Sequence, residues 1–183
     1  MQSAAAELVP HPASPVEAIR AVAACIAHAH DHGWRLQFRV EGSMSRLRWP
    51  DRAAPDRADG LWQHSCFEAF LRADGDDGYH EFNFATSGAW AAWRFAARRR
   101  GRESPELPPP AIGVERGAEF LEMSVALAPA ALPLPDGARC VHAGLAAVIE
   151  DDAGRLSYWA LAHPGPQPDF HNPAGFAIAL PLR

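Results

Sequence analysis

Hydrophobic residues recur at every second position along several short segments of this chain, and this period constrains the fold more than any other feature. Residues 34–40 are the clearest case, because arginine and glutamine alternate strictly with apolar residues. The apolar members are Trp34, Leu36, Phe38 and Val40. Successive side chains of a β-strand point to opposite faces, so the pattern predicts a strand with one buried face.

Further strands are expected wherever similar segments lie between turn-forming residues. They cover residues 63–72, 79–85, 90–95, 112–114, 120–126, 140–150, 155–162 and 176–180, with a short strand at 47–50 and an edge strand at 8–12. Glycine, proline and acidic residues separate them, as in the sequence ADGDDG of residues 73–78. About ten short strands without alternating helices predict an all-β, antiparallel β-sandwich of jelly-roll type. The length of 183 residues fits a single domain over residues 1–183.

Residues 16–26 are compatible with two kinds of element. A stripe at helical spacing consists of Val16, Ile19, Val22, Ala23 and Ile26. Alternation instead places Ile19, Ala21, Ala23 and Cys25 on one face of a strand. The high alanine content favours a helix by local propensity, and the residues alone leave both elements open.

Composition and charge exclude several classes of protein. A net charge of −5 provides no basic field that would attract nucleic acid. The cysteines, Cys25, Cys66 and Cys140, are odd in number and far apart, which rules out a disulfide framework or a paired CxxC metal motif. The first residues show no secretory signal pattern, and no apolar run is long enough to span a membrane. We therefore expect a cytoplasmic protein with no nucleic-acid or membrane partner.

Four sequence motifs resemble those of a known group of proteins. They are LWQHSCFEAFL at 61–71, YHEFNFATSGAWAAWRF at 79–95, GLAAVIEDDAGRLSYWALAHP at 144–164 and PDFH at 168–171. In combination they resemble the bacterial DOMON-like proteins, which are related to the family 9 carbohydrate-binding modules. The similar part runs from Trp34 to the end of the chain.

The resemblance implies a jelly-roll sandwich that presents a ligand site on one face or edge. Related modules bind sugars, often between aromatic rings, and other DOMON domains bind haem through side chains that include methionine and histidine. The methionines here, Met1, Met44 and Met123, lie in no recognisable haem-ligand motif, which argues against haem. The resemblance also favours a strand for residues 16–26.

A polar group on neighbouring predicted strands is the first candidate for ligand binding. Glu68 lies in the middle of a strand, where a carboxylate is costly unless it is paired or exposed. Glu81 and Asn83 share a face of the following strand, and Arg94 on the next strand could supply a countercharge. Such a group would suit hydroxyl-rich ligands, although a structural salt-bridge network is the equally simple alternative.

Tryptophans form the second candidate group, because aromatic rings stack on the apolar faces of sugars. Those in or beside the motifs are Trp62, Trp90, Trp93 and Trp159. Trp90 and Trp93 are three positions apart, so they face opposite sides of a strand and at least one belongs to the core. Trp62, beside a glycine-containing loop, is the best candidate for a ligand platform.

Histidines form the third group. His64 and His163 could contact a ligand, and together with Asp169 and His171 they could bind a metal ion or act in acid–base chemistry. Alternate histidines at 28–32 could also point the same way and hold a metal. Solvated loops are the ordinary location of such residues, and no spacing among them is diagnostic.

Taken together, these features favour a non-catalytic domain that binds a small ligand, above all a carbohydrate or sugar derivative, and that needs no cofactor or metal. The alternatives are a haem-binding redox module, a glycoside hydrolase using Glu68 and Glu81, and a scaffold whose sheet face contacts a protein. The sequence leaves the ligand and the oligomeric state open.

Overall fold

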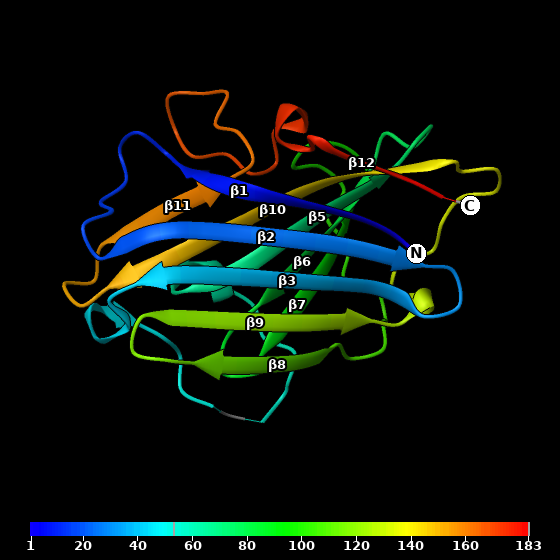
Figure 1. Ribbon diagram of the computed structural model, residues 1–183. Coiled ribbons are helices and arrows are strands. Elements are labelled where there is room, and N and C mark those ends of the chain that lie inside the picture. Colours follow the sequence, from blue (N-terminus) through cyan, green and yellow to red (C-terminus); the bar gives the residue numbers. More distant parts are fainter. Residues whose placement is uncertain (53, 183) are drawn as a thin grey trace.

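Two layers of antiparallel strands make up the computed structural model, which describes residues 1–52 and 54–182 (Figure 1). The first layer contains, in spatial order, β1 (Gln2–Pro10), β2 (Ile19–Ala29), β3 (Gly33–Gly42), β9 (Phe120–Leu127) and β8 (Ala111–Arg116). The second contains β7 (Trp90–Phe95), β6 (Tyr79–Phe84), β5 (Cys66–Ala73), β10 (Cys140–Asp151) and β11 (Leu156–Ala160). Two short strands, β4 (Leu47–Arg48) and β12 (Ile178–Pro181), also pair with β10.

The two layers join along one side, because the last residues of β1 pair with β11. The helical content is confined to four single turns, η1 (Met44–Arg46), η2 (Leu61–Gln63), η3 (Pro129–Ala131) and η4 (Pro173–Gly175), within the residues described. The named strands pair only in antiparallel fashion. The predicted all-β antiparallel sandwich is therefore confirmed, whereas its jelly-roll type stays a prediction.

The hydrophobic core lies between the layers and consists of the inward face of each strand. Phe38 of β3 meets Phe67 of β5 across the sandwich, with ring centroids 5.0 Å apart. Leu71, Phe82 and Phe84 belong to the same buried cluster. These residues are the ones that the two-residue period assigned to the core, because inward side chains must alternate with outward ones along a strand.

We expect Phe67→Ala to lower the free energy of unfolding by about 3–5 kcal/mol, since the cavity left behind adds to the lost burial. The Phe67 side chain is 1% exposed and packs between Phe38 and Trp49. Urea unfolding measures the change. Val114→Ala, at a position 38% exposed, is the matched control and should change stability by at most about 0.5 kcal/mol. A similar small change for both variants would contradict the core placement.

The ambiguous N-terminal segment forms a strand, as the resemblance implied, but it begins at Ile19 and not at residue 16. β2 is paired on both sides, to β1 and β3, so backbone hydrogen bonds outweigh the helix propensity of its alanines. A register shift after Ile19 lets this residue point inward together with Val22 and Ala24.

The expected edge strand at 8–12 is wrong in both extent and place. β1 extends back to Gln2 and has a partner on each side. Its first half contains small residues without a hydrophobic alternation, so nothing in the sequence marked it as a strand.

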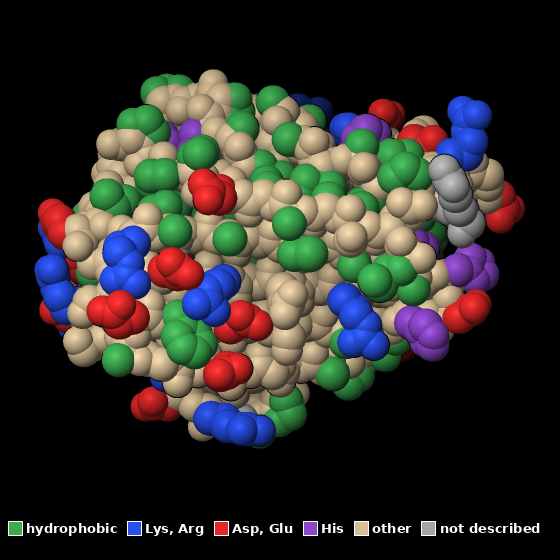
Figure 2. Space-filling view, viewed as in Figure 1, with side chains coloured by type: hydrophobic (Ala, Val, Ile, Leu, Met, Phe, Trp, Pro, Cys, Tyr) green, Lys and Arg blue, Asp and Glu red, His purple; other side chains and the backbone are tan. Residues whose placement is uncertain are grey.

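The outer face of the first layer carries mixed charge (Figure 2). Arg39 pairs there with Glu41 at 3.0 Å and with Glu122 at 3.2 Å. Exposed pairs of this kind contribute little stability, and their opposite charges leave no strongly charged field on this face. Cys25, Cys66 and Cys140 are all free thiols. Across residues 1–52 and 54–182, no helix has the length and apolar character needed to traverse a bilayer.

Candidate functional site

A cavity of about 630 Å³ opens on the outer face of the second layer. Its floor is the sheet itself, formed by outward side chains of β5, β6, β7, β10 and β11. Three loops supply the rim: residues 59–62 before β5, residues 99–102 after β7, and residues 167–171 after β11. Volumes of this size are typical of sites for small molecules.

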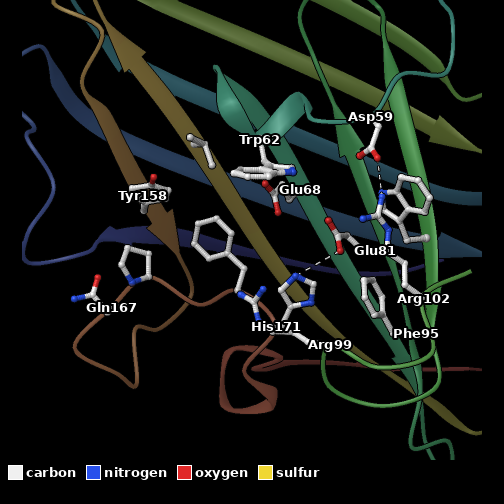
Figure 3. Close-up of a pocket in the computed structure, with 14 residues that line it drawn as sticks. Asp59, Trp62, Glu68, Glu81, Phe95, Arg99, Arg102, Tyr158, Gln167 and His171 are labelled. Atoms are coloured by element: carbon white, nitrogen blue, oxygen red, sulfur yellow. Dashed lines mark hydrogen bonds and ion pairs between the residues drawn. The ribbon is translucent and has the colours of Figure 1, made fainter.

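The register of three consecutive strands brings the predicted carboxylates into this cavity. Glu68 of β5 lies opposite Asn83 of β6, and Glu81 of β6 lies opposite Trp93 of β7. Glu68 and Glu81 are therefore diagonal neighbours on one face, with β-carbons typically ~7 Å apart. Both point into the cavity, which separates them from the core residues on the opposite face (Figure 3).

Two tryptophans form aromatic walls. Trp62, in η2, is 52% exposed, and its indole ring lines the same cavity as the Glu68 carboxyl group (Figure 3). Trp93 is half-buried and is covered by the Arg102 guanidinium, 3.6 Å from the ring centroid. Phe95 adds a third ring to the lining.

Both carboxyl groups resist ionisation. Burial, together with the neighbouring charge of Glu81, raises the pKa of Glu68 well above its ordinary value. Burial likewise raises the pKa of Glu81, although the hydrogen bond from Asn83 and the charges of Arg102 and Arg99 oppose this rise. The Asn83 amide donates to Glu81 Oε1 at 2.8 Å and so fixes the orientation of that carboxyl group.

His171 closes the cavity from the loop that follows β11. Its Nδ1 lies 2.7 Å from the Tyr79 hydroxyl, and its Nε2 lies 3.6 Å from Glu81 Oε2. Burial, with the positive charge of Arg99, lowers the pKa of His171 to about 4. The imidazole is therefore neutral at physiological pH and contributes hydrogen-bonding capacity to the site, without positive charge.

This loop can lie against the sheet because β10 carries a glycine beneath it. A β-carbon at Gly144 would come within 2.8 Å of the Phe176 ring. Phe176 packs against Phe70 and Tyr79 in a second hydrophobic cluster, separate from the core between the layers. The cluster supports the loop that carries His171.

A basic cluster at 98–102, with the sequence RRRGR, contributes two arginines to the rim. Arg102 donates to Asp59 at 2.9 Å. Arg99 donates to Asp169 at 2.9 Å, and its backbone N–H donates to the Tyr79 hydroxyl at 3.2 Å. Arg99 has a left-handed backbone with φ of 56°, a conformation that non-glycine residues rarely adopt and that concentrates at functional sites.

Four of the predicted site residues line the cavity, namely Trp62, Glu68, Glu81 and Trp93. Asn83 supports it from beneath through Glu81. Sequence reasoning missed the rim residues Asp59, Arg99, Arg102, Gln167 and Phe170, and Tyr158 of β11, as members of the site. The rim residues lie in loops, where no period marks which way a side chain points.

Arg94 does not reach the carboxylates. It follows Trp93 directly, so it points to the other face of β7, where it holds Asp76 at 2.8 Å. Trp90 shares that face and is 5% exposed in the core. The strict alternation along β7 places Trp93 beside Glu81 and therefore turns Trp90 and Arg94 away from the cavity.

The three other predicted residues also lie outside the cavity lining. Trp159 is buried in the core, where its Nε1 donates to the Ser157 hydroxyl. His64 is exposed and lies 2.7 Å from Glu150. His163 bonds the Val9 carbonyl at 2.9 Å. These contacts give each side chain a structural role at its own position.

Within the described part of the chain, no three histidine, cysteine or acidic side chains are grouped in a way that could hold a metal ion. Met44 and Met123 lie in the core between the layers, away from the cavity. The side chains that open to the site instead offer carboxyl groups, guanidinium groups and aromatic rings.

No family model matches the chain, and no curated protein matches it. Two solved structures share its architecture. A candidate carbohydrate-binding protein from Bacteroides uniformis superposes with a TM-score of 0.65 at 18% identity, over 94% of this chain and 83% of that one. A family 9 carbohydrate-binding module from Caldicellulosiruptor kristjanssonii, in complex with cellotriose, superposes with a TM-score of 0.53 at 7% identity, over 81% of this chain and 67% of that one. At these identities the likeness establishes a shared β-sandwich fold.

Proposed function

We propose that this protein binds a carbohydrate or sugar derivative in the cavity on the outer face of the second layer, without catalysing a reaction. The observation that carries the proposal is that the exposed Trp62 ring and the buried Glu68 carboxyl group line the same cavity. An aromatic plane can stack on the apolar face of a sugar ring while a carboxyl group of the same cavity bonds a hydroxyl. The fold likeness to two proteins described as carbohydrate-binding supports this reading.

We also infer kinship with the DOMON-like proteins, which the sequence motifs support. Among the activities of that wider group, sugar binding agrees better with the cavity than haem binding does. Methionine, one of the haem ligands expected from the resemblance, is not among the residues that line it. The free thiols agree with the proposed cytoplasmic location.

Calorimetric titration with a panel of sugars tests the proposal. The panel contains glucose, galactose, mannose, xylose, glucosamine and N-acetylglucosamine, with the β-1,4-linked di- and trisaccharides of glucose and glucosamine. At least one member should bind with saturable heat, and the same member should alter the fluorescence of the tryptophans at the cavity. Saturable binding that leaves this fluorescence unchanged would remove the assignment to this cavity, and no binding across the panel would end the proposal.

A glycoside hydrolase is the second candidate, because cleavage of a glycosidic bond ordinarily uses two neighbouring carboxyl groups, and the raised pKa of Glu68 suits the general acid of such a pair. This candidate predicts turnover of aryl glycosides that is lost in Glu68→Gln. Absence of turnover by a protein that binds the corresponding sugar would favour the non-catalytic function.

A further inference from the structure

Glu68 is a buried carboxyl group without a partner. Its residue is 4% exposed, and among the described residues its carboxylate makes no hydrogen bond and no ion pair. Glu81 accepts one hydrogen bond from Asn83, and its ion-pair candidate within residues 1–52 and 54–182 is His171, which is neutral at physiological pH. Two carboxyl groups therefore face the same space, and neither is paired with an arginine of the described residues.

The arginines of the rim form their ion pairs elsewhere, although the charges of Arg99 and Arg102 oppose the rise in the pKa of Glu81. Arg102 is held by Asp59, and Arg99 is held by Asp169, which also accepts from Arg98. Three guanidinium groups thus share two carboxylates at the rim, and none of them forms an ion pair with a carboxyl group of the floor. Among the described residues, Glu68 and Glu81 are therefore acidic groups of the cavity without an arginine partner.

Aromatic rings surround the same space. Trp62, Trp93, Phe95, Tyr158 and Phe170 all line the cavity. Aromatic faces attract cations through the negative potential of their π-electrons, most strongly where water is excluded. A carboxylate floor within aromatic walls is complementary to a compact positive charge.

We propose that the cavity selects a sugar that carries a protonated amine, and that the ammonium group lies between the carboxylates of Glu68 and Glu81. This inference rests on the proposed function and narrows its ligand to amino sugars. An ammonium group has three N–H donors and no acceptor, so it can donate to both carboxylates at once. A hydroxyl at the same position has one donor and would leave the repulsion between the two acidic groups uncompensated.

Calorimetry with three matched sugars tests the inference on the unaltered protein. Glucosamine, glucose and N-acetylglucosamine differ at one ring position, which carries an ammonium, a hydroxyl or a neutral amide. Near neutral pH, glucosamine should bind at least about tenfold more tightly than either neutral sugar, since charge-assisted hydrogen bonds are roughly twice as strong as neutral ones.

Glu68→Gln keeps the shape of the side chain and removes its negative charge. We expect this variant to lose the preference for glucosamine, so that the three sugars bind within about threefold of one another. Glu115→Gln, at an exposed position on β8 outside the cavity, is the matched control and should retain the full preference.

The pH dependence gives a second measurement that needs no variant. Glu68 holds its proton in the empty cavity to higher pH than an ordinary carboxyl group, so an ammonium ligand must displace that proton. Glucosamine binding should therefore release protons, seen as a dependence of the binding heat on the ionisation enthalpy of the buffer. Its affinity should fall as the pH is lowered, whereas a neutral sugar that accepts a hydrogen bond from protonated Glu68 would show the opposite trend.

The outcomes separate this inference from the proposed function. Equal or tighter binding of glucose, or a glucosamine preference that survives in Glu68→Gln, would overturn the amino-sugar specificity and leave carbohydrate binding in place. Failure of every sugar to bind would overturn both.

Discussion

Replacing Trp62 by alanine is expected to weaken sugar binding by about 10- to 100-fold, as for an aromatic residue at the centre of a binding site. The ring is 52% exposed and lines the cavity together with Glu68, so a ligand in the cavity can reach it. Its removal should change the free energy of unfolding by no more than about 0.5 kcal/mol, because an exposed side chain adds little to the core. Calorimetric titration with the tightest sugar of the panel, beside urea unfolding, measures both quantities.

Trp159→Phe is the matched control for this experiment. Trp159 is 4% exposed in the core and donates to the Ser157 hydroxyl at 3.0 Å. Its substitution should lower stability by about 1–2 kcal/mol through the lost hydrogen bond and the altered packing, while affinity stays unchanged. Equal affinity for the wild type and Trp62→Ala would contradict the assignment of Trp62 as the stacking platform.

Glu68→Gln is expected to stabilise the empty protein near neutral pH by about 1–3 kcal/mol, because it removes the cost of a buried, unpartnered carboxyl group. The pKa of Glu68 is raised in the folded state, so the folded protein retains a proton that the unfolded chain releases above its ordinary value of 4.5. Stability contributed by this proton is fully present below that value and is lost as the pH rises through the folded-state pKa. The advantage of the variant should therefore grow with pH and then level off.

The buried histidines change the stability of the fold with pH in the opposite direction, and their contribution must be separated from that of Glu68. Burial, together with nearby arginine, lowers the pKa of His80 and of His171 from 6.5 to about 4. Both histidines therefore favour the folded state above pH 6.5 and cease to do so as the pH falls towards 4. Since this loss occurs equally in the wild type and in Glu68→Gln, it cancels in the difference between them.

Urea unfolding of both proteins from acid to neutral pH provides the measurement. Glu115→Gln serves as the control, because an exposed glutamate should give a difference near zero at every pH. A stability difference for Glu68→Gln that stays constant with pH would show that Glu68 ionises normally in the fold.

Glu68→Gln should thus raise the stability of the empty protein and lower its preference for an amino sugar. Burial of the unpartnered Glu68 carboxyl group lowers the stability of the empty protein, and in the proposed complex the same group contacts the ligand. Sites of this kind retain groups that the folded state would be more stable without, because binding supplies the missing partner.

The sequence by itself determined which face of each strand belongs to the core. Alternation separated Phe67 and Phe84 from Glu68 and Glu81 correctly, because the two-residue period is a property of any extended backbone. It also required Trp90 and Trp93 to lie on opposite faces of their strand, and only the structure shows that Trp93 is the one that faces the cavity. The all-β class followed from the same signal.

Only the tertiary structure decided how those faces meet and what covers them. Residues 16–26 satisfied a helix and a strand equally, and pairing of β2 with strands on both sides chose between them. Arg94 was expected beside Glu81, but register places Trp93 there and turns Arg94 to Asp76. The rim arginines and His171 belong to loops, whose positions follow from contacts with residues distant in sequence. Local periodicity carries no information about such contacts, which is why the carboxylate floor of the site could be predicted and, apart from Trp62, its rim could not.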